Sequence, residues 1–157
     1  MSEMLNVSPG ERPENDAGYL EMMTKVIFMG GLNRQVVESK WDGFLEAFDQ
    51  FEPGKVASFT EEDVERLSEN ERIIRYGAKI RAVVDNAGEM VDIAAEHGSF
   101  GQWLGRNVEE EGVADTAKMI GKRFAYMSEA SAERYLYAVG EEVGDVPEDI
   151  QRKYGPA

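Results

Sequence analysis

The sequence predicts an all-helical protein, and three observations lead to this prediction. Apolar residues recur at intervals of three and four along each apolar segment, which is the period of an amphipathic helix. Residue types that cap helices stand directly before several of these segments. No segment shows the apolar–polar alternation that is typical of a half-buried strand. The chain has 157 residues, a length that suits a single domain.

The composition changes near both ends of the chain, and these changes set the expected domain limits. Residues 1–15 contain two prolines, several charges and no periodicity, so we expect a mobile arm there. Residues 16–146 hold the periodic segments and form the expected helical domain. Pro147 then separates a short polar tail, residues 147–157.

The first two helices follow the arm. Asp16 is the expected N-cap of a helix in which residues 19–29 place apolar side chains on all sides. A helix that is apolar all round is buried, so we expect it at the centre of the domain. A Gly-Gly pair ends this helix, and Asn33 can cap a second one that passes Trp41 and reaches Phe48.

The middle of the chain is expected to contain a turn, a short helix and a long helix. Pro53-Gly54 marks the turn, and Thr60 with three acidic residues after it resembles a capping box. Gly98 ends the long helix. One apolar stripe runs along it, namely Ile73, Tyr76, Ile80, Val83, Ala87, Val91 and Ala94. The expected shared core includes Ile73, Ile80, Val84, Val91, Phe44, Phe48 and Leu67.

The last third of the chain is predicted to contain two main helices, preceded by a short helix or turn. Ser99 can cap a short helix or turn, and residues 108–112 are expected to form an acidic loop. A helix is predicted over residues 114–124. The turn Tyr126-Met127-Ser128 follows, and Ser128 can cap the last main helix.

The formal net charge of −14 is unusual for a protein that binds DNA. Neutralisation of phosphates supplies most of the affinity for DNA, so a basic surface is the rule. One interpretation is that the protein no longer binds DNA. The other is a saline cytoplasm, in which the Debye length falls to about 3 Å at 1 M salt and distant repulsion is screened. The scattered acidic residues favour the saline interpretation.

The residues that usually bind metals are scarce. The chain has no cysteine and one histidine, His97, so we expect neither disulfides nor a structural zinc site. No cofactor is expected either. The lack of cysteines, of a membrane-length apolar run and of a secretory-signal layout favours the cytoplasm.

The segment FEPGKVASFTEEDVERLSENERIIRYGAKIRAVVDNA resembles the 3-methyladenine DNA glycosylase I family. That family carries F-D-P-x-K-V-A-x-M, then E-E-D-V-E-R-L, then I-I-R-x-x-x-K-I-x-A-x-x-x-N-A. The match needs no gap and uses Pro53, Lys55, Val56, Ala57, Glu61, Glu62, Asp63, Val64, Arg66, Leu67, Ile73, Ile74, Arg75, Lys79, Ile80, Asn86 and Ala87. Weaker similarity extends over roughly residues 19–140.

This resemblance implies the helix-hairpin-helix DNA glycosylase fold, with the hairpin near residues 114–139. Such an enzyme bends DNA and flips the damaged nucleotide into a pocket. A 3-methylated adenine is cationic and leaves readily. The family therefore relies on shape, on stacking and on a carboxylate that recognises the base.

The chain departs from the family where the base should be bound. The family's recognition glutamate lies in an L-E-G-x-Q-A-G-L-S-W segment, and the ungapped match places Val26 at that glutamate and Arg34 at that tryptophan. The family's zinc clamp of two cysteines and two histidines is also missing. Glu21, Glu38 and Trp41 are the nearest replacements, with Glu21 and Glu38 as candidate catalytic acids.

Two basic clusters are candidates for DNA contact. The first, Arg72, Arg75 and Lys79, has the spacing of one helix face, and such a stripe can equally be an ordinary solvated face. The second, Lys118, Lys122 and Arg123, lies just before the predicted hairpin turn. That turn contains no glycine, although glycine normally allows close approach of backbone N–H groups to phosphate.

The leading hypothesis is therefore a divergent DNA glycosylase that excises alkylated bases from double-stranded DNA in base-excision repair. The alternatives are a non-catalytic relative that binds DNA or a protein partner, and an acidic interaction module. Because Val26 replaces the recognition acid, we expect weak or absent release of 3-methyladenine, and Val26→Glu is expected to restore some release if the stacking surface is intact.

Overall fold

The computed structural model describes residues 10–156, and within that range the chain is helical with no strand. This confirms the predicted fold class. The segments run in the order α1 (Asp16–Met29), α2 (Arg34–Ser39), α3 (Trp41–Ala47), the 3-10 turn η2 (Asp49–Phe51), α4 (Pro53–Ala57), α5 (Glu61–Ser68), α6 (Gly77–His97), α7 (Phe100–Arg123), α8 (Glu129–Ala138) and α9 (Glu148–Tyr154). No helix among the described residues is long and apolar enough to cross a membrane.

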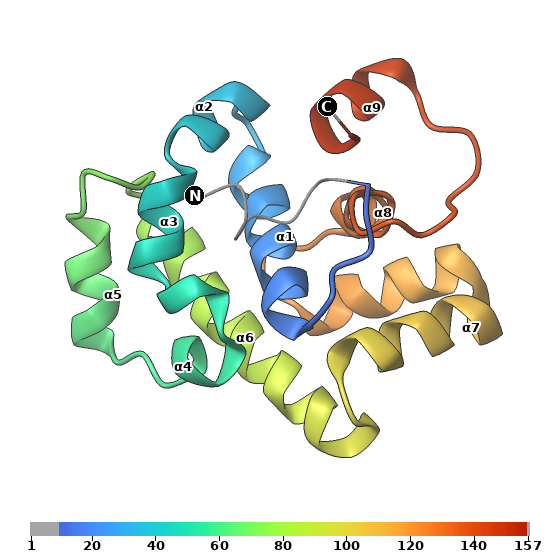
Figure 1. Cartoon of the computed structure of the whole chain (residues 1–157), viewed down its shortest axis with the longest axis horizontal. Helices are drawn as coiled ribbons and strands as arrows, with labels where there is room; N and C mark the ends of the chain where they lie inside the picture. The colour runs from blue at the N-terminus through green and yellow to red at the C-terminus, as the bar shows by residue number, and fades with distance from the viewer. Residues whose placement is uncertain (1–9, 157) are drawn as a thin grey trace.

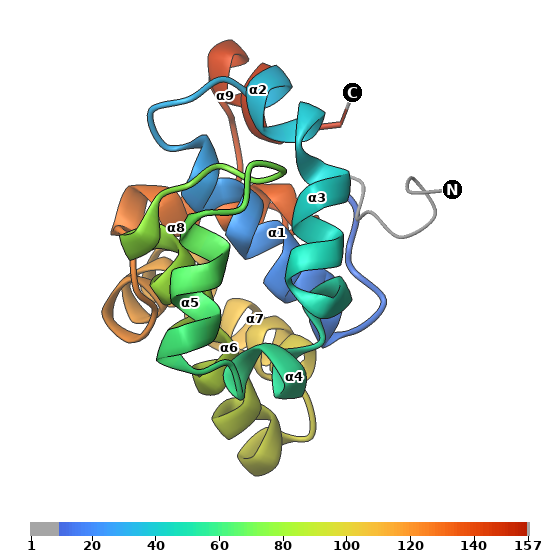
Figure 2. The same cartoon turned by 90° about the vertical axis from the view of Figure 1, so that its left-hand side faces the viewer.

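Helix α1 lies at the centre, as its all-round apolar pattern predicts. Every residue from 18 to 29 is buried, because α1 packs against α6, α8, η2, α2, α7 and α4. Figures 1 and 2 show the short helices α2 to α5 on one side of α1 and helices α7 to α9 on the other. Helix α6 contacts α1, α4, α5 and α7, and so joins the two sides.

Several helix ends are capped as predicted. Asn33, Ser99 and Ser128 each accept a hydrogen bond from a backbone N–H in the first turn of their helix. Thr60 forms a capping box with Asp63, since each side chain bonds to the other's backbone N–H. Pro53-Gly54 is not the predicted turn but the first turn of α4, where proline suits the first position.

Asp16 caps a different helix from the one predicted. Asn15 is the N-cap of α1, and its side chain accepts from the Gly18 N–H. The carboxylate of Asp16 accepts from the N–H groups of Phe100 and Gly101, at 2.8 Å and 3.1 Å. It therefore stabilises the start of α7, where unpaired N–H groups and the helix dipole favour an anion.

Two predicted boundaries in the long helices are wrong. Helix α6 begins at Gly77, so Ile73 and Tyr76 precede it, and both Tyr76 and Val91 are exposed. Of the expected core, Val84 is half-buried and Val91 is not part of it. The predicted loop residues 108–111, of which 109–111 are glutamates, continue α7, and only Gly112, with φ of 86°, interrupts it. A positive φ suits glycine, so the interruption occurs at that residue alone.

Both terminal segments differ from the prediction within the described residues. Residues 1–9 of the predicted mobile arm, and residue 157, lie outside the described range. Residues 10–15 lie along the domain, because the Gly10 N–H bonds to the Ala138 carbonyl and Arg12 pairs with Glu141 at 3.3 Å. The expected polar tail contains α9, whose Tyr154 is buried.

Candidate functional site

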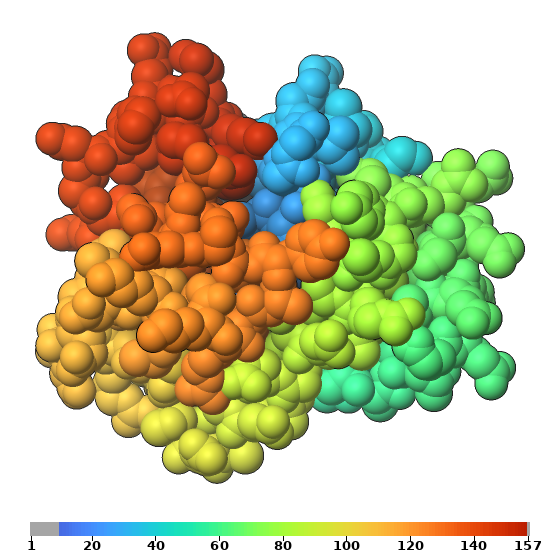
Figure 3. Space-filling model, turned by 180° about the vertical axis from the view of Figure 1, so that it is seen from behind, coloured from blue at the N-terminus to red at the C-terminus, as the bar shows by residue number. Residues whose placement is uncertain are grey.

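A cleft of about 610 Å³ lies between the segment that follows α1 and the C-terminal helix α9. Its lining residues are Gly31, Leu32, Asn33, Arg34, Gln35, Asp149, Arg152 and Lys153. Figure 3 shows this region from behind, where the blue residues after α1 face the red residues of α9. Pockets for small ligands measure roughly 300–1,000 Å³. The volume of the cleft lies within this range.

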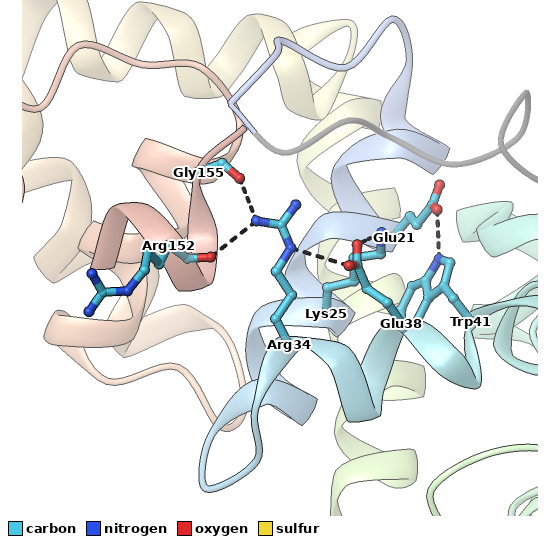
Figure 4. Close-up of polar contacts among 7 residues, drawn as sticks. All are labelled: Glu21, Lys25, Arg34, Glu38, Trp41, Arg152 and Gly155. Atoms are coloured by element: carbon cyan, nitrogen blue, oxygen red, sulfur yellow. Dashed lines mark hydrogen bonds and ion pairs between the residues drawn. The ribbon is translucent and has the colours of Figure 1, made fainter. Parts of the chain in front are cut away.

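Arg34 joins the two walls of the cleft. Its Nη1 donates to the carbonyl oxygens of Gly155 and Arg152, at 2.7 Å and 3.3 Å, and its Nε donates to Oε2 of Glu38 at 3.3 Å (Figure 4). The two carbonyls lie at the C-terminal end of α9, which carries the negative end of the helix dipole. The guanidinium therefore holds α9 against α2.

The end of α9 fits closely against α8. A Cβ atom at Gly155 would lie 2.5 Å from the hydroxyl of Tyr137 and 2.6 Å from the carbonyl oxygen of Gln151, so only glycine fits there. Tyr154 is buried beside it, with the Arg134 guanidinium 5.7 Å from its ring centroid. Burial raises the pKa of the Tyr154 hydroxyl, and nearby Arg134 opposes this shift.

A buried polar group lies behind the cleft, at the contact of α1 with α3. The indole Nε1 of Trp41 donates to Oε2 of Glu21 at 2.8 Å, and both side chains are buried (Figure 4). Trp41 stacks on Phe44 and Phe51, with ring centroids 4.8 Å and 5.4 Å away. Trp41 and Glu21 are therefore part of the packed interior.

Lys25 completes this group. Its Nζ lies 4.9 Å from the centroid of the Trp41 ring and 3.9 Å from Oε1 of Glu38. Burial lowers the pKa of Lys25, and the carboxylates of Glu21 and Glu38 act against that shift. Glu38 thus forms ion pairs with two cations, Lys25 inside and Arg34 at the cleft.

The three aligned pocket positions do not line one cavity together. Arg34 lines the cleft, whereas Val26 and Trp41 are 3% and 2% exposed and lie in the core. Of the two candidate acids, Glu38 forms an ion pair with Arg34, which lines the cleft, and Glu21 lies in the interior. Their catalytic roles stay predictions.

The first basic cluster does not form a stripe on one helix. Arg72 and Arg75 precede α6, and Arg72 forms an ion pair with Glu46 at 2.7 Å. Lys79 is 9% exposed, and its Nζ donates to the Gly30 carbonyl at 3.0 Å. Burial lowers the pKa of Lys79, and the positive charge of Lys153 lowers it further. Lys79 therefore lies beside the end of α1 rather than on a solvated face.

The second basic cluster is divided in a similar way. Arg123 bonds to Oε2 of Glu89 at 2.6 Å and lies 5.4 Å from the centroid of the Trp103 ring. It therefore ties α7 to α6. Lys118 and Lys122 are exposed, and so is Arg75, and within residues 10–156 these three cations form no ion pair.

The sequence profile described as methyladenine glycosylase matches residues 10–134, which include helices α1 to α7 and the first part of α8. The chain belongs to the methyladenine glycosylase family. This confirms the resemblance seen in the sequence. Within the part of the chain that the structure covers, no group of three or more His, Cys, Asp or Glu side chains is arranged to hold a metal ion.

Two curated relatives of this family each match about half of the chain. The DNA-3-methyladenine glycosylase 1 of Escherichia coli strain K12 is 42% identical over 76 residues, which cover 48% of this chain and 41% of that protein. The DNA-3-methyladenine glycosylase of Haemophilus influenzae is 37% identical over 79 residues, covering 48% and 42%. The matched region thus spans about two fifths of each relative's length.

Solved structures of the family share the fold over most of the chain. A crystal structure of 3-methyladenine DNA glycosylase I superposes with a TM-score of 0.76 at 25% identity, covering 85% of this chain and 83% of that one. A variant of a 3-methyladenine DNA glycosylase I in complex with 3-methyladenine also superposes with a TM-score of 0.76. The two chains are 24% identical, and the match covers 86% of this chain and 82% of that one. The helix-hairpin-helix glycosylase fold is thereby confirmed.

Sequence reasoning missed the wall of the cleft that α9 forms. Asp149, Arg152 and Lys153 all lie in the segment that was read as a polar tail. One signal could have found it, since Ile150 and Tyr154 follow Pro147 with the spacing of one helical turn.

Proposed function

We propose that this protein is a DNA glycosylase of the 3-methyladenine type, which hydrolyses the bond between an alkylated base and its deoxyribose. The observation that carries the proposal is the family match over residues 10–134, which spans helices α1 to α7 and the first part of α8. The names of the curated relatives and the complex of a related enzyme with 3-methyladenine support the same substrate class.

The cleft between α1 and α9 suits the uptake of a flipped nucleotide. Arg152 and Lys153 give it positive charge for the phosphates of the bent strand, and its volume fits a base. Asp149 lines the same cleft, and Glu38 is held at its edge by Arg34. Because 3-methyladenine is cationic while it is bonded to the sugar, a carboxylate at this position favours binding of the damaged base over an unmodified, neutral one.

The test is base release from methylated double-stranded DNA, measured for the native protein from about 0.1 M to 1 M salt and beyond. We expect release of alkylated adenine that persists at high salt, and slower release by Asp149→Asn or Glu38→Gln. Absence of release at every salt concentration, with retained folding, would favour the non-catalytic relative, which the substitution at Val26 also suggests.

A further inference from the structure

Two tyrosines stand out on the surface of the hairpin side. Tyr76 is 48% exposed and Tyr126 is 49% exposed, and their rings pack edge to face with centroids 6.3 Å apart. Tyr76 is the residue before α6, and Tyr126 lies in the turn between α7 and α8. Large aromatic rings left in water are a typical feature of surfaces that bind a partner.

The backbone of Tyr126 adds a second observation. Its φ of 59° lies in the left-handed region, which bulky residues rarely occupy and which glycine occupies freely. The turn is fixed by Asn86, which both donates to the carbonyl of Ala125 and accepts from its N–H, at 3.1 Å and 2.7 Å. The chain thus keeps an aromatic ring at a position where glycine would suit the backbone better, and strain of this kind collects at functional sites.

The charges around the two rings indicate what they bind. Nζ of Lys79 lies 5.1 Å from the centroid of the Tyr76 ring and also donates to Gly30, the residue before the first lining residue of the cleft. Arg75 and Lys122, close in sequence to the two tyrosines, are exposed and form no ion pair within residues 10–156. A cation beside an aromatic ring, with unpaired cations close by in the sequence, matches a polymer of phosphates and bases.

We propose that Tyr76 and Tyr126 form a stacking surface for an unpaired base of DNA beside the cleft. The proposal rests on the proposed function, because flipping a nucleotide leaves the neighbouring base without its stacking partner. Stacking on an aromatic ring tolerates every base. The two tyrosines therefore hold the opened strand next to the lesion and do not select the lesion itself.

The experiment measures binding to two labelled duplexes, one intact and one with a tetrahydrofuran abasic analogue. Tyr126→Gly removes the ring and relieves the backbone, so its melting temperature should equal or exceed that of the native protein. Its affinity for the abasic duplex should fall about tenfold, with a smaller loss on the intact duplex. Tyr76→Ala should behave similarly, and Tyr126→Phe should keep native affinity because the ring remains. Val91→Ala, at an exposed apolar residue of α6, is the matched control.

Base release from methylated DNA, measured on the same proteins, separates this proposal from the proposed function. If the native protein releases base and Tyr126→Gly binds the abasic duplex as tightly as the native protein, the stacking surface is wrong and the function stands. If Tyr126→Gly loses affinity equally for the abasic and the intact duplex, the stacking surface is also wrong. If binding depends on the tyrosine rings but no base is released, the stacking surface is supported and the proposed glycosylase activity is wrong. Absence of binding to either duplex would overturn both.

Discussion

Arg34 and Gly155 are joined by a 2.7 Å hydrogen bond from a guanidinium Nη1 to a backbone carbonyl, which connects α2 to the end of α9 across the cleft. The two residues are far apart in sequence. The contact makes the C-terminal helix a wall of the candidate site.

Arg34→Ala should release α9 from this position. A hydrogen bond from a charged donor contributes about 1.5–3 kcal/mol, so amide hydrogen exchange in residues 148–155 should become at least about tenfold faster. Gln35→Ala is the matched control, because Gln35 is the exposed neighbour of Arg34 in α2 and lies outside α9. Unchanged exchange in the Arg34 variant would show that Tyr154 and Gly155 hold the helix without it.

Glu21→Ala should destabilise the whole domain. The indole N–H of Trp41 would lose a buried acceptor, which costs about 1–3 kcal/mol. Glu21→Gln keeps an acceptor oxygen and should cost less. Urea unfolding of the three proteins measures the difference. If both variants unfold like the native protein but lose base release, Glu21 is a functional acid rather than a structural one.

Val26→Glu should lower stability more than it changes activity. Val26 is 3% exposed, so a carboxylate there would be removed from water and would cost several kcal/mol if it stayed ionised. Val91→Glu places the same acid on the exposed side of α6 and serves as the control. Thermal unfolding checks the expectation. A stable Val26→Glu protein with faster release of 3-methyladenine would instead support the aligned position as the base pocket.

Tyr135 should make the protein less stable in alkali. Burial raises the pKa of its hydroxyl well above 10.0, and the hydroxyl donates to the Tyr19 carbonyl at 2.9 Å. Because the unfolded chain releases this proton near pH 10, the stabilisation is complete below that pH and is lost above it, by up to about 1.4 kcal/mol per pH unit.

Tyr135→Phe isolates this effect. The lysines with lowered pKa values are the same in both proteins, so the difference in their unfolding free energies reports Tyr135 alone. The variant should be less stable at pH 8 because it lacks the hydrogen bond. The difference in unfolding free energy between the two proteins should become smaller above pH 10. A difference that stays constant up to about pH 11.5 would contradict the raised pKa.

Lys118→Gln with Lys122→Gln should weaken DNA binding for every sequence alike. Each phosphate contact contributes about 0.9 to the slope of log affinity against log salt, so the double variant should flatten the slope by up to about 1.8. Arg123 is left intact, because it joins α7 to Glu89 of α6. Lys55→Gln, an exposed lysine of α4, is the control. An unchanged slope would exclude this end of α7 from the DNA contact.

The sequence alone determined the class of fold and most of its helices. Periodicity and capping depend on residues within one or two turns of each other, so the central α1, the capping box at Thr60 and the caps at Ser99 and Ser128 could be predicted from local patterns. The family could be identified because the middle of the chain keeps specific residues in an ungapped order.

Only the tertiary structure decided which residues far apart in the sequence meet. Asp16 caps α7 rather than α1, Lys79 turns inward to Gly30, and Arg34 reaches the carbonyl of Gly155. Each of these partners lies many residues away, and a local pattern carries no information about such a distance. Asp16 was therefore predicted to cap its own helix, and Lys79 to contact DNA or solvent, while the packing of the helices gives both side chains distant partners.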